Sequence, residues 1–165
     1  MTGKKVNEKI GRIYSINVSK KKGEKKSPVE SSSVNRFGIE GDGHAGKWHR
    51  QVSLLSYESI AEFNRKGNIL AKPGDFAENI TTEGIDIRKL KIGDKILVSK
   101  NARVNFDDLH TYVILEVTQL GKECKKPCSI YYQVGSCIMP AEGIFCRVVN
   151  TGSIRVRDNI LIIKK

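Results

Sequence analysis

The chain has 165 residues, of which 39% are apolar and 28% charged, and its formal net charge is +11 at neutral pH. These values fit one globular domain with a hydrophobic core, and they exclude a collagen, a coiled coil and a wholly disordered protein. We expect a cytoplasmic protein without a membrane association, because no stretch approaches the roughly 20 apolar residues of a membrane span and the first residues lack a secretory signal.

The first expected element is a strand over residues 9–18, where apolar and polar residues alternate with a period of two. Residues 1–8 are expected to form an N-terminal tail. The lysine-rich segment 20–33 then reads as an exposed basic loop, whose simplest role is solubility. It could also attract a phosphate-bearing ligand by electrostatic steering. Nucleic acid is disfavoured as its partner, because no aromatic residue interleaves with the lysines to stack bases.

Short strands are expected along most of the remaining chain. The pattern predicts one helix over Ser56–Lys66, with Ser56 as its N-cap and Gly67 as its end. The expected strands lie at 33–40, 51–55, 77–82, 95–99, 111–118, 144–149 and 159–163. Many short strands separated by Gly, Asp and Asn turns predict a mainly β domain over residues 9–165, closed or folded over as a small barrel.

Two nine-residue stretches of the chain echo each other. Residues 90–98 (LKIGDKILV) and 154–162 (IRVRDNILI) each combine a short β segment, a turn ending in Asp and a strand. The echo predicts that two strands enter the barrel in the same way, at corners related by pseudo-symmetry.

The segment 41–50 (GDGHAGKWHR) is the first candidate for chemistry. Its glycines allow close approach of the backbone to a ligand, and it precedes a buried strand. An alternative is that Asp42 only stabilises a turn and that His49 is a surface residue. His44 and His49 do not have the spacing of a helical metal pair, so a metal here would need a further ligand from elsewhere.

Four cysteines form the second candidate cluster. Their pattern is Cys124-x3-Cys128-x8-Cys137-x8-Cys146. Zinc ribbons usually use C-x2-C knuckles, so a structural zinc site is disfavoured. Cys146 lies in an apolar strand and reads as a buried thiol. Cys124 follows a strand end among lysines, which favour the thiolate that attacks sulfur or binds a soft metal. Cys128 and Cys137 are either resolving thiols, extra ligands or inert packing.

The third candidate is the turn-strand-turn segment 74–84 (GDFAENITTEG). Its polar side chains could line the mouth of a pocket. Asn79 can both donate and accept hydrogen bonds, which suits a heterocycle or an oxyanion. It suits a bent backbone equally well, so a structural role for this segment is the alternative.

Several short segments match one family in order and spacing. They are 38–46 (GIEGDGHAG), 50–55 (RQVSLL), 74–80 (GDFAENI), 90–94 (LKIGD), 116–119 (EVTQ), Cys124, 135–145 (GSCIMPAEGIF) and 147–148 (RV). Together they resemble the MOSC family, which occurs at the C-terminus of molybdenum-cofactor sulfurases and as small stand-alone proteins. The resemblance covers most of residues 9–163 and implies a β-barrel-like fold with few helices.

The resemblance also implies a site. Cys124 aligns with the essential cysteine, which is thought to carry persulfide sulfur or to ligate the molybdenum of a pterin cofactor. By the same resemblance, the pocket candidates around it are Asp42, His44, Arg50, Asn79 and Arg147. One departure is visible, because the final turn reads Arg157-Asp158 where the family usually has Gly-Asp. Only the geometry of that turn is put in question.

The resemblance favours a carrier or binding module over a complete sulfurase. The 165 residues contain no aminotransferase-like domain with a Schiff-base lysine, so the pyridoxal phosphate binding associated with full sulfurases is not expected here. A partner such as a cysteine desulfurase would supply sulfur, and a protein requiring molybdenum or sulfur would accept it. Any catalysis would be sulfur transfer through a cysteine persulfide. The rival interpretation is a non-catalytic basic small-barrel module that binds RNA or protein.

Overall fold

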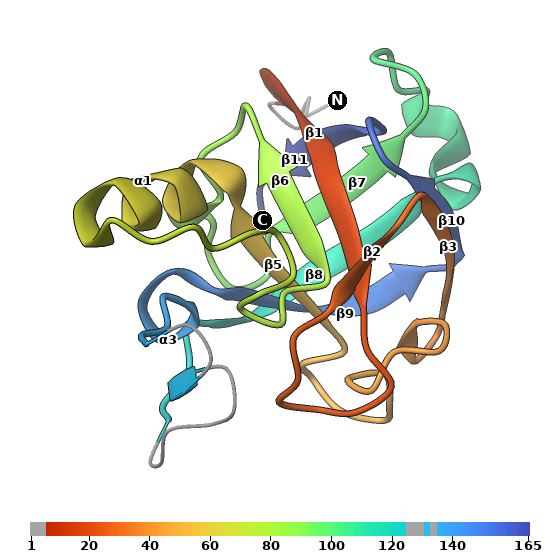
Figure 1. The fold of residues 1–165 in the computed structure, drawn as a ribbon. Helices are drawn as coiled ribbons and strands as arrows, with labels where there is room; N and C mark the ends of the chain where they lie inside the picture. The colour runs from red at the N-terminus through yellow and green to blue at the C-terminus, as the bar shows by residue number, and fades with distance from the viewer. Residues whose placement is uncertain (1–5, 125–130, 133–134) are drawn as a thin grey trace.

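The computed structural model describes residues 6–124, 131–132 and 135–165, which form a mainly β domain around a closed barrel (Figure 1). The strands are β1 (Val6–Val18), β2 (Ser27–Val29), β3 (Ser31–Asn35), β4 (Gly38–Ile39), β5 (Val52–Ser56), β6 (Ile80–Glu83), β7 (Lys95–Ser99), β8 (Val113–Leu120), β9 (Ile144–Asn150), β10 (Gly152–Arg155) and β11 (Asn159–Ile163). Seven of them follow the order β11-β7-β8-β9-β5-β6-β1, and pairing of β11 with β1 closes the barrel. The mainly β, barrel-like prediction is confirmed.

The remaining strands extend this barrel at its rim. β2 pairs with the end of β1, and a separate sheet has the order β10-β3-β4. Within the barrel all pairings are antiparallel except that of β5 with β6. The parallel pair is joined by a connection that contains the main helix, as parallel strands require.

Helices are few in the described residues. They are α1 (Tyr57–Gly67), α3 (Met139–Glu142) and the 3-10 turns η1 (Ile87–Lys89) and η2 (Phe106–Thr111). Ser56 caps α1 as predicted, because its hydroxyl accepts a hydrogen bond from Ser59 N. The helix continues through Gly67, and Asn68 ends it in a left-handed conformation at φ 49°. None of the described helices is both long and apolar enough to cross a membrane.

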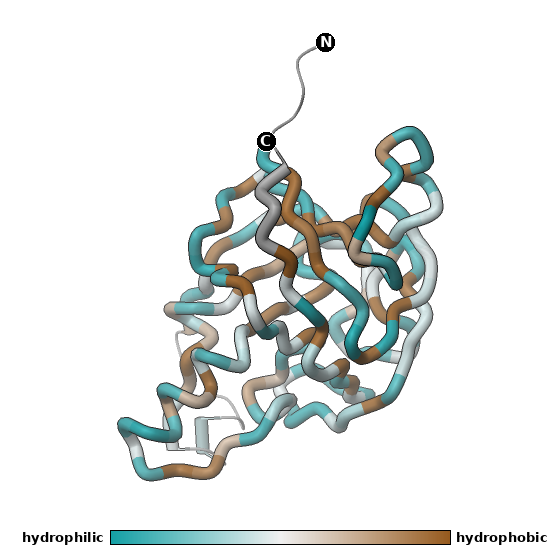
Figure 2. The backbone as a smooth tube through the Cα atoms, turned by 90° about the horizontal axis from the view of Figure 1, so that it is seen from above, coloured by the Kyte–Doolittle hydropathy of each residue, from teal (hydrophilic) through white to brown (hydrophobic). Residues whose placement is uncertain are grey.

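Three apolar clusters stabilise the domain, the smallest of them formed by Leu97, Ile114, Leu161 and Ile163. The barrel interior is filled by Ile, Leu and Val side chains from most strands, including Ile16, Leu54 and Ile160. A second cluster around Phe76 and Phe145 packs α1 and α3 against the outside of the barrel. Figure 2 shows hydrophobic residues concentrated along the central strands, whereas the outlying loops are mainly hydrophilic.

The N-terminal part corrects two sequence predictions. β1 begins at Val6, so residues 6–8 belong to a strand and not to the predicted tail. The segment 20–33 is not one exposed loop, since it contains β2 and the start of β3, and Lys26 within it is buried. The start of β1 pairs with the distant β11, whereas β2 forms a hairpin with the end of β1 and β3 pairs with the distant β10.

The two echoed stretches do adopt equivalent turns. Asp94 N donates to the carbonyl of Lys91, and Asp158 N donates equivalently to the carbonyl of Arg155, both at 3.0 Å. Each aspartate also accepts from the backbone three residues earlier, at 2.9 Å and 2.8 Å respectively. Arg157 takes the positive φ that Gly93 has, 76° against 94°, so the departure from Gly-Asp preserves the turn.

Candidate functional site

The loop that follows β4 is organised by one buried carboxylate. Asp42 Oδ1 accepts hydrogen bonds from Lys26 Nζ at 2.7 Å and from Ser19 N at 3.0 Å. Asp42 Oδ2 accepts from His44 N at 2.9 Å. Burial favours a higher pKa for Asp42, but the bonds from Lys26 and the two backbone amides outweigh it and lower the pKa. The carboxylate therefore stays ionised and fixes the loop.

His44 and Trp48 lie together in this loop. Their rings are stacked with centroids 6.2 Å apart, and Trp48 Nε1 donates to the His44 carbonyl at 2.7 Å. Burial, aided by Lys26, lowers the pKa of His44 to about 4, so its imidazole is neutral at pH 7. His44 Nδ1 is buried and has no hydrogen-bond partner among the described residues.

Two cations lie over the indole ring of Trp48. Lys22 Nζ is 4.1 Å and the Arg50 guanidinium carbon 4.7 Å from the ring centroid. Arg50 also lies 5.5 Å from the Phe145 ring, and its buried Nε has no hydrogen-bond partner in the described part of the chain. We call Lys22, His44, Trp48 and Arg50 the cationic cluster. Within the described residues, neither Lys22 nor Arg50 forms an ion pair, so the cluster has unbalanced positive charge.

The loop of the cationic cluster contacts the end of β8, just ahead of Cys124. His49 Nε2 lies 2.7 Å from Gln119 Oε1, and the Thr118 hydroxyl donates to the His49 carbonyl. Lys122 is near enough to contribute to the lowered pKa of His44. Lys122 N then donates to the Pro140 carbonyl at 3.2 Å, which ties the segment before Cys124 to α3. The structure therefore places the first candidate segment against the end of β8, a few residues before Cys124.

The described cysteines differ in accessibility. Cys124 is exposed, Cys137 is half-buried at the edge of the second apolar cluster, and Cys146 is fully buried in the barrel. Cys146 is the buried thiol that the sequence predicts, and burial raises its pKa. Cys128 lies outside the described residues.

We expect Cys124 to react first with an alkylating reagent, because it is the exposed thiol among the three described. Cys146 should stay protected in the folded protein, since it is buried and its neutral form is favoured. Mass spectrometry of peptides after timed treatment with iodoacetamide measures this order. Modification of Cys146 before Cys124 under native conditions would contradict the assignment.

Asn79 and Arg147 are placed differently. The Asn79 amide is fully buried, accepts from Ser53 N at 3.0 Å and donates to the Asn17 carbonyl at 3.2 Å. These bonds join β5, β1 and the start of β6 and leave no surface for a ligand. Arg147 is exposed on β9, where its guanidinium pairs with Glu116 at 3.0 Å on the adjacent strand.

Glu78, which precedes Asn79, is a site residue that the sequence motifs did not single out. Its side chain is buried, and Oε1 accepts from Gly74 N at 2.6 Å and from Thr81 Oγ1 at 2.9 Å. Oε2 is buried with no hydrogen-bond partner among the described residues. Burial raises the pKa of Glu78 to about 7. The available signal was a glutamate between two apolar residues, Ala77 and Ile80, within the expected strand 77–82, with only Asn79 between it and Ile80.

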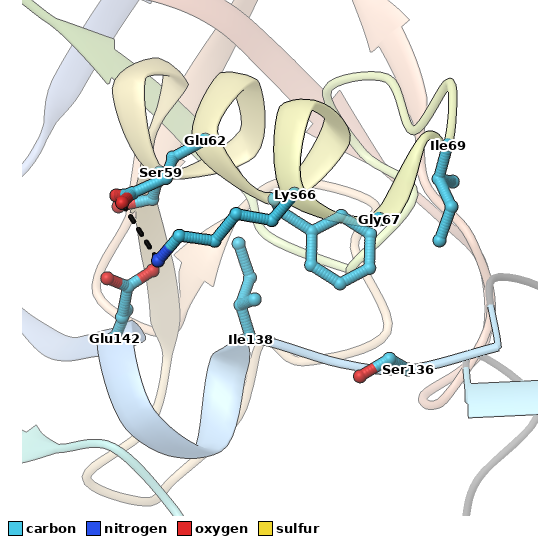
Figure 3. Close-up of a pocket in the computed structure, with 9 residues that line it drawn as sticks. Ser59, Glu62, Lys66, Gly67, Ile69, Ser136, Ile138 and Glu142 are labelled. Carbon is cyan, nitrogen blue, oxygen red and sulfur yellow. Dashed lines mark ion pairs between the residues drawn. The ribbon is translucent and has the colours of Figure 1, made fainter.

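A separate cavity of about 440 Å³ lies between α1 and the 136–142 segment (Figure 3). Phe63, Ile69 and Ile138 give it apolar walls, and Lys66, paired with Glu62 at 3.0 Å, lies along one side. None of the predicted site residues that lie within 6–124, 131–132 and 135–165 lines this cavity. It is therefore distinct from the cationic cluster.

Comparison with known proteins identifies the fold. A family model described as MOSC domain matches residues 41–161. The crystal structure of the YuaD protein from Bacillus subtilis is similar, with a TM-score of 0.73 and 19% identity over 94% of this chain and 97% of that chain. YiiM from Geobacillus stearothermophilus aligns with a TM-score of 0.68 and 19% identity, covering 93% of this chain and 75% of that one. YiiM from Escherichia coli aligns with a TM-score of 0.61 and 16% identity over 93% and 70%. No curated protein sequence matches the chain.

Proposed function

The chain belongs to the MOSC domain family, and we propose that it is a sulfur carrier in which Cys124 accepts sulfane sulfur beside the cationic cluster. One observation carries this proposal. Cys124 is exposed just after β8, and the end of that strand contacts His49 in the loop that also bears Trp48 and Arg50. Positive charge near an exposed thiol favours its thiolate, which is the form that attacks the outer sulfur of a donor persulfide.

The transfer step needs no oxidant. The Cys124 thiolate attacks the outer sulfur of a persulfide on a donor protein, and a new S–S bond forms on Cys124. The donor's own S–S bond breaks, and the donor leaves as a thiolate that takes up a proton from water. An acceptor nucleophile then attacks the outer sulfur of Cys124 and restores the thiolate. A cysteine desulfurase is the class of donor that forms such a persulfide.

The same residues fit a molybdenum-pterin cofactor as the group to which sulfur is delivered. Thiolate is a soft ligand suited to molybdenum, and Arg50 Nε is a buried donor without a hydrogen-bond partner among the described residues, as an anionic ligand would require. When bound, the cofactor would supply two-electron redox chemistry at the metal. Cys124 would hold the metal, and Arg50 with Lys22 would hold the phosphate. Neutral His44 would add no charge but could accept or donate one hydrogen bond.

Sulfur loading is tested directly with the reduced protein. We expect incubation with a cysteine desulfurase and cysteine, or with inorganic polysulfide, to add one sulfur atom to the peptide containing Cys124. Protein isolated from its native host is analysed in parallel for molybdenum and pterin. Absence of added sulfur and of both cofactor components would contradict the proposal.

RNA binding is the competing function, and salt separates it from sulfur transfer. Lys22 and Arg50 both lie over Trp48, so the one tryptophan near the lysines is already engaged by cations. We therefore expect only weak RNA binding, and we expect substitution of Lys20 to Lys22 by glutamine to slow sulfur loading modestly. Fluorescence anisotropy with labelled RNA measures the first, and loading kinetics measure the second. Tight RNA binding that weakens steeply with salt and survives Cys124→Ala would favour the rival function.

A further inference from the structure

Lys26 is a buried lysine in a segment whose other lysines are exposed. Its side chain has no exposed surface, and its ammonium donates to Asp42 Oδ1 at 2.7 Å and to Ser19 Oγ at 3.0 Å. By contrast, the side chain of the neighbouring Lys25 is 41% exposed, and its ammonium pairs with Asp75 Oδ1 at 3.9 Å. Adjacent lysines therefore have different roles, and only Lys26 reaches the loop of the cationic cluster by direct hydrogen bonds to its aspartate.

The backbone of Lys26 contacts a third segment. Lys26 N donates to the Gly74 carbonyl at 2.8 Å, and a Cβ on Gly74 would lie 2.2 Å from the Lys26 carbonyl oxygen. The 19–26 and 41–46 segments are also in backbone contact, because Gly43 N donates to the Ser19 carbonyl at 2.8 Å. Lys26 thus lies where three segments distant in sequence meet.

A buried ion pair of this kind is rarely required for stability. Desolvating an ammonium and a carboxylate offsets their attraction, and an apolar pair of similar volume is often equally stable. Burial indeed lowers the pKa of Lys26, although Asp42 acts in the opposite direction. An apolar pair would lack the carboxylate that organises the loop. With Lys26 bonded to it, Asp42 is oriented so that Oδ1 accepts from Ser19 N and Oδ2 accepts from His44 N.

We infer that Lys26 is a positioning residue that holds Asp42, and through it His44 and Trp48, in the arrangement that forms the cationic cluster. Trp48 donates a hydrogen bond to the His44 carbonyl and lies under Lys22 and Arg50. A displacement of the Asp42 turn would therefore also displace Trp48 and change its contacts with both cations. Its effect on sulfur loading rests on the proposed function. The effect on the loop itself does not.

The experiment compares Lys26→Met with the matched control Lys25→Met. Trp48 is the only tryptophan of the chain, so its emission and its quenching by acrylamide report the loop directly. We expect altered emission and stronger quenching in Lys26→Met, with wild-type values in Lys25→Met. Loading of Cys124 from polysulfide should slow about 10-fold in Lys26→Met, the scale typical of residues that orient a ligand-bearing group.

Lys26→Met leaves the buried carboxylate of Asp42 without its cation, which could prevent folding. A second variant is therefore needed. Lys26→Met combined with Asp42→Asn removes both buried charges, and we expect it to fold and to retain the altered Trp48 quenching. Wild-type Trp48 emission and quenching in whichever of these variants folds would overturn the inference. If the wild-type protein takes up no sulfur, the proposed function fails, and the Trp48 comparison still decides the role of Lys26.

Discussion

Replacement of Cys124 by alanine is expected to abolish sulfur loading and to leave the fold intact. The thiol is the atom that forms the S–S bond, so no neighbouring cation can substitute for it. Cys124 is exposed after the end of β8, and it belongs to none of the apolar clusters. Its removal therefore creates no cavity. Circular dichroism and urea unfolding check the fold, and mass spectrometry after polysulfide treatment checks loading. Molybdenum retention, where the wild-type protein shows it, should be lost as well.

Cys137→Ala provides a matched control in the same region. Cys137 is half-buried beside the second apolar cluster, so its removal should lower stability slightly without preventing loading of Cys124. The same loading assay on Cys128→Ala decides whether that thiol has an auxiliary role. Normal sulfur loading by Cys124→Ala would refute the proposed mechanism even though the MOSC fold is established.

Replacement of Glu78 by glutamine is expected to change how stability depends on pH. The amide keeps an oxygen that accepts from Gly74 N and Thr81 Oγ1, but it cannot ionise. Burial raises the pKa of Glu78 from 4.5 to about 7, with Asp75 adding to the rise and Lys26 the nearby cation. A folded-state pKa above the unfolded value gives stability that is present below pH 4.5 and is lost as pH rises through about 7.

The size of this effect follows from the shift. A difference of about 2.5 pKa units corresponds to roughly 3 kcal/mol in the free energy of unfolding. The advantage of Glu78→Gln over the wild-type protein should therefore grow as pH rises from 4.5 to about 7 and stay at about 3 kcal/mol above that pH. Urea unfolding at several pH values measures this difference.

His44 acts in the opposite direction in the wild-type protein. Its pKa is lowered from 6.5 to about 4, so its contribution is present above pH 6.5 and is lost as pH falls toward about 4. The two contributions offset each other between these values, and we expect a nearly flat wild-type profile there. Glu78→Gln should expose the His44 slope, with stability falling on acidification. Glu62→Gln on α1, a carboxylate that is 44% exposed and pairs with Lys66, serves as the control. An identical pH profile for Glu78→Gln and wild type would contradict the assignment.

Local patterns were sufficient for much of the fold. Alternating residues predict the strands, and β7 and β11 have the expected bounds, because side-chain periodicity depends on neighbours in sequence. Ser56 was identifiable as a cap for the same reason, since its partner Ser59 is three residues away. The family, too, was recognisable from short motifs in order, and the match over residues 41–161 confirms it.

Contacts between segments distant in sequence determine which residues of the candidate site are buried and which polar groups meet. Sequence alone does not distinguish Lys26 from Lys25, because burial of one depends on Asp42, which comes from another segment. Likewise, Asn79 matched a family motif, yet its amide is taken up by Ser53 and Asn17 from β5 and β1. No aromatic residue lies among the lysines in the sequence, but in the folded protein Trp48 lies beneath Lys22. Which polar groups face each other across a barrel is set by strand register and loop closure, and neither is a property of any local stretch of residues.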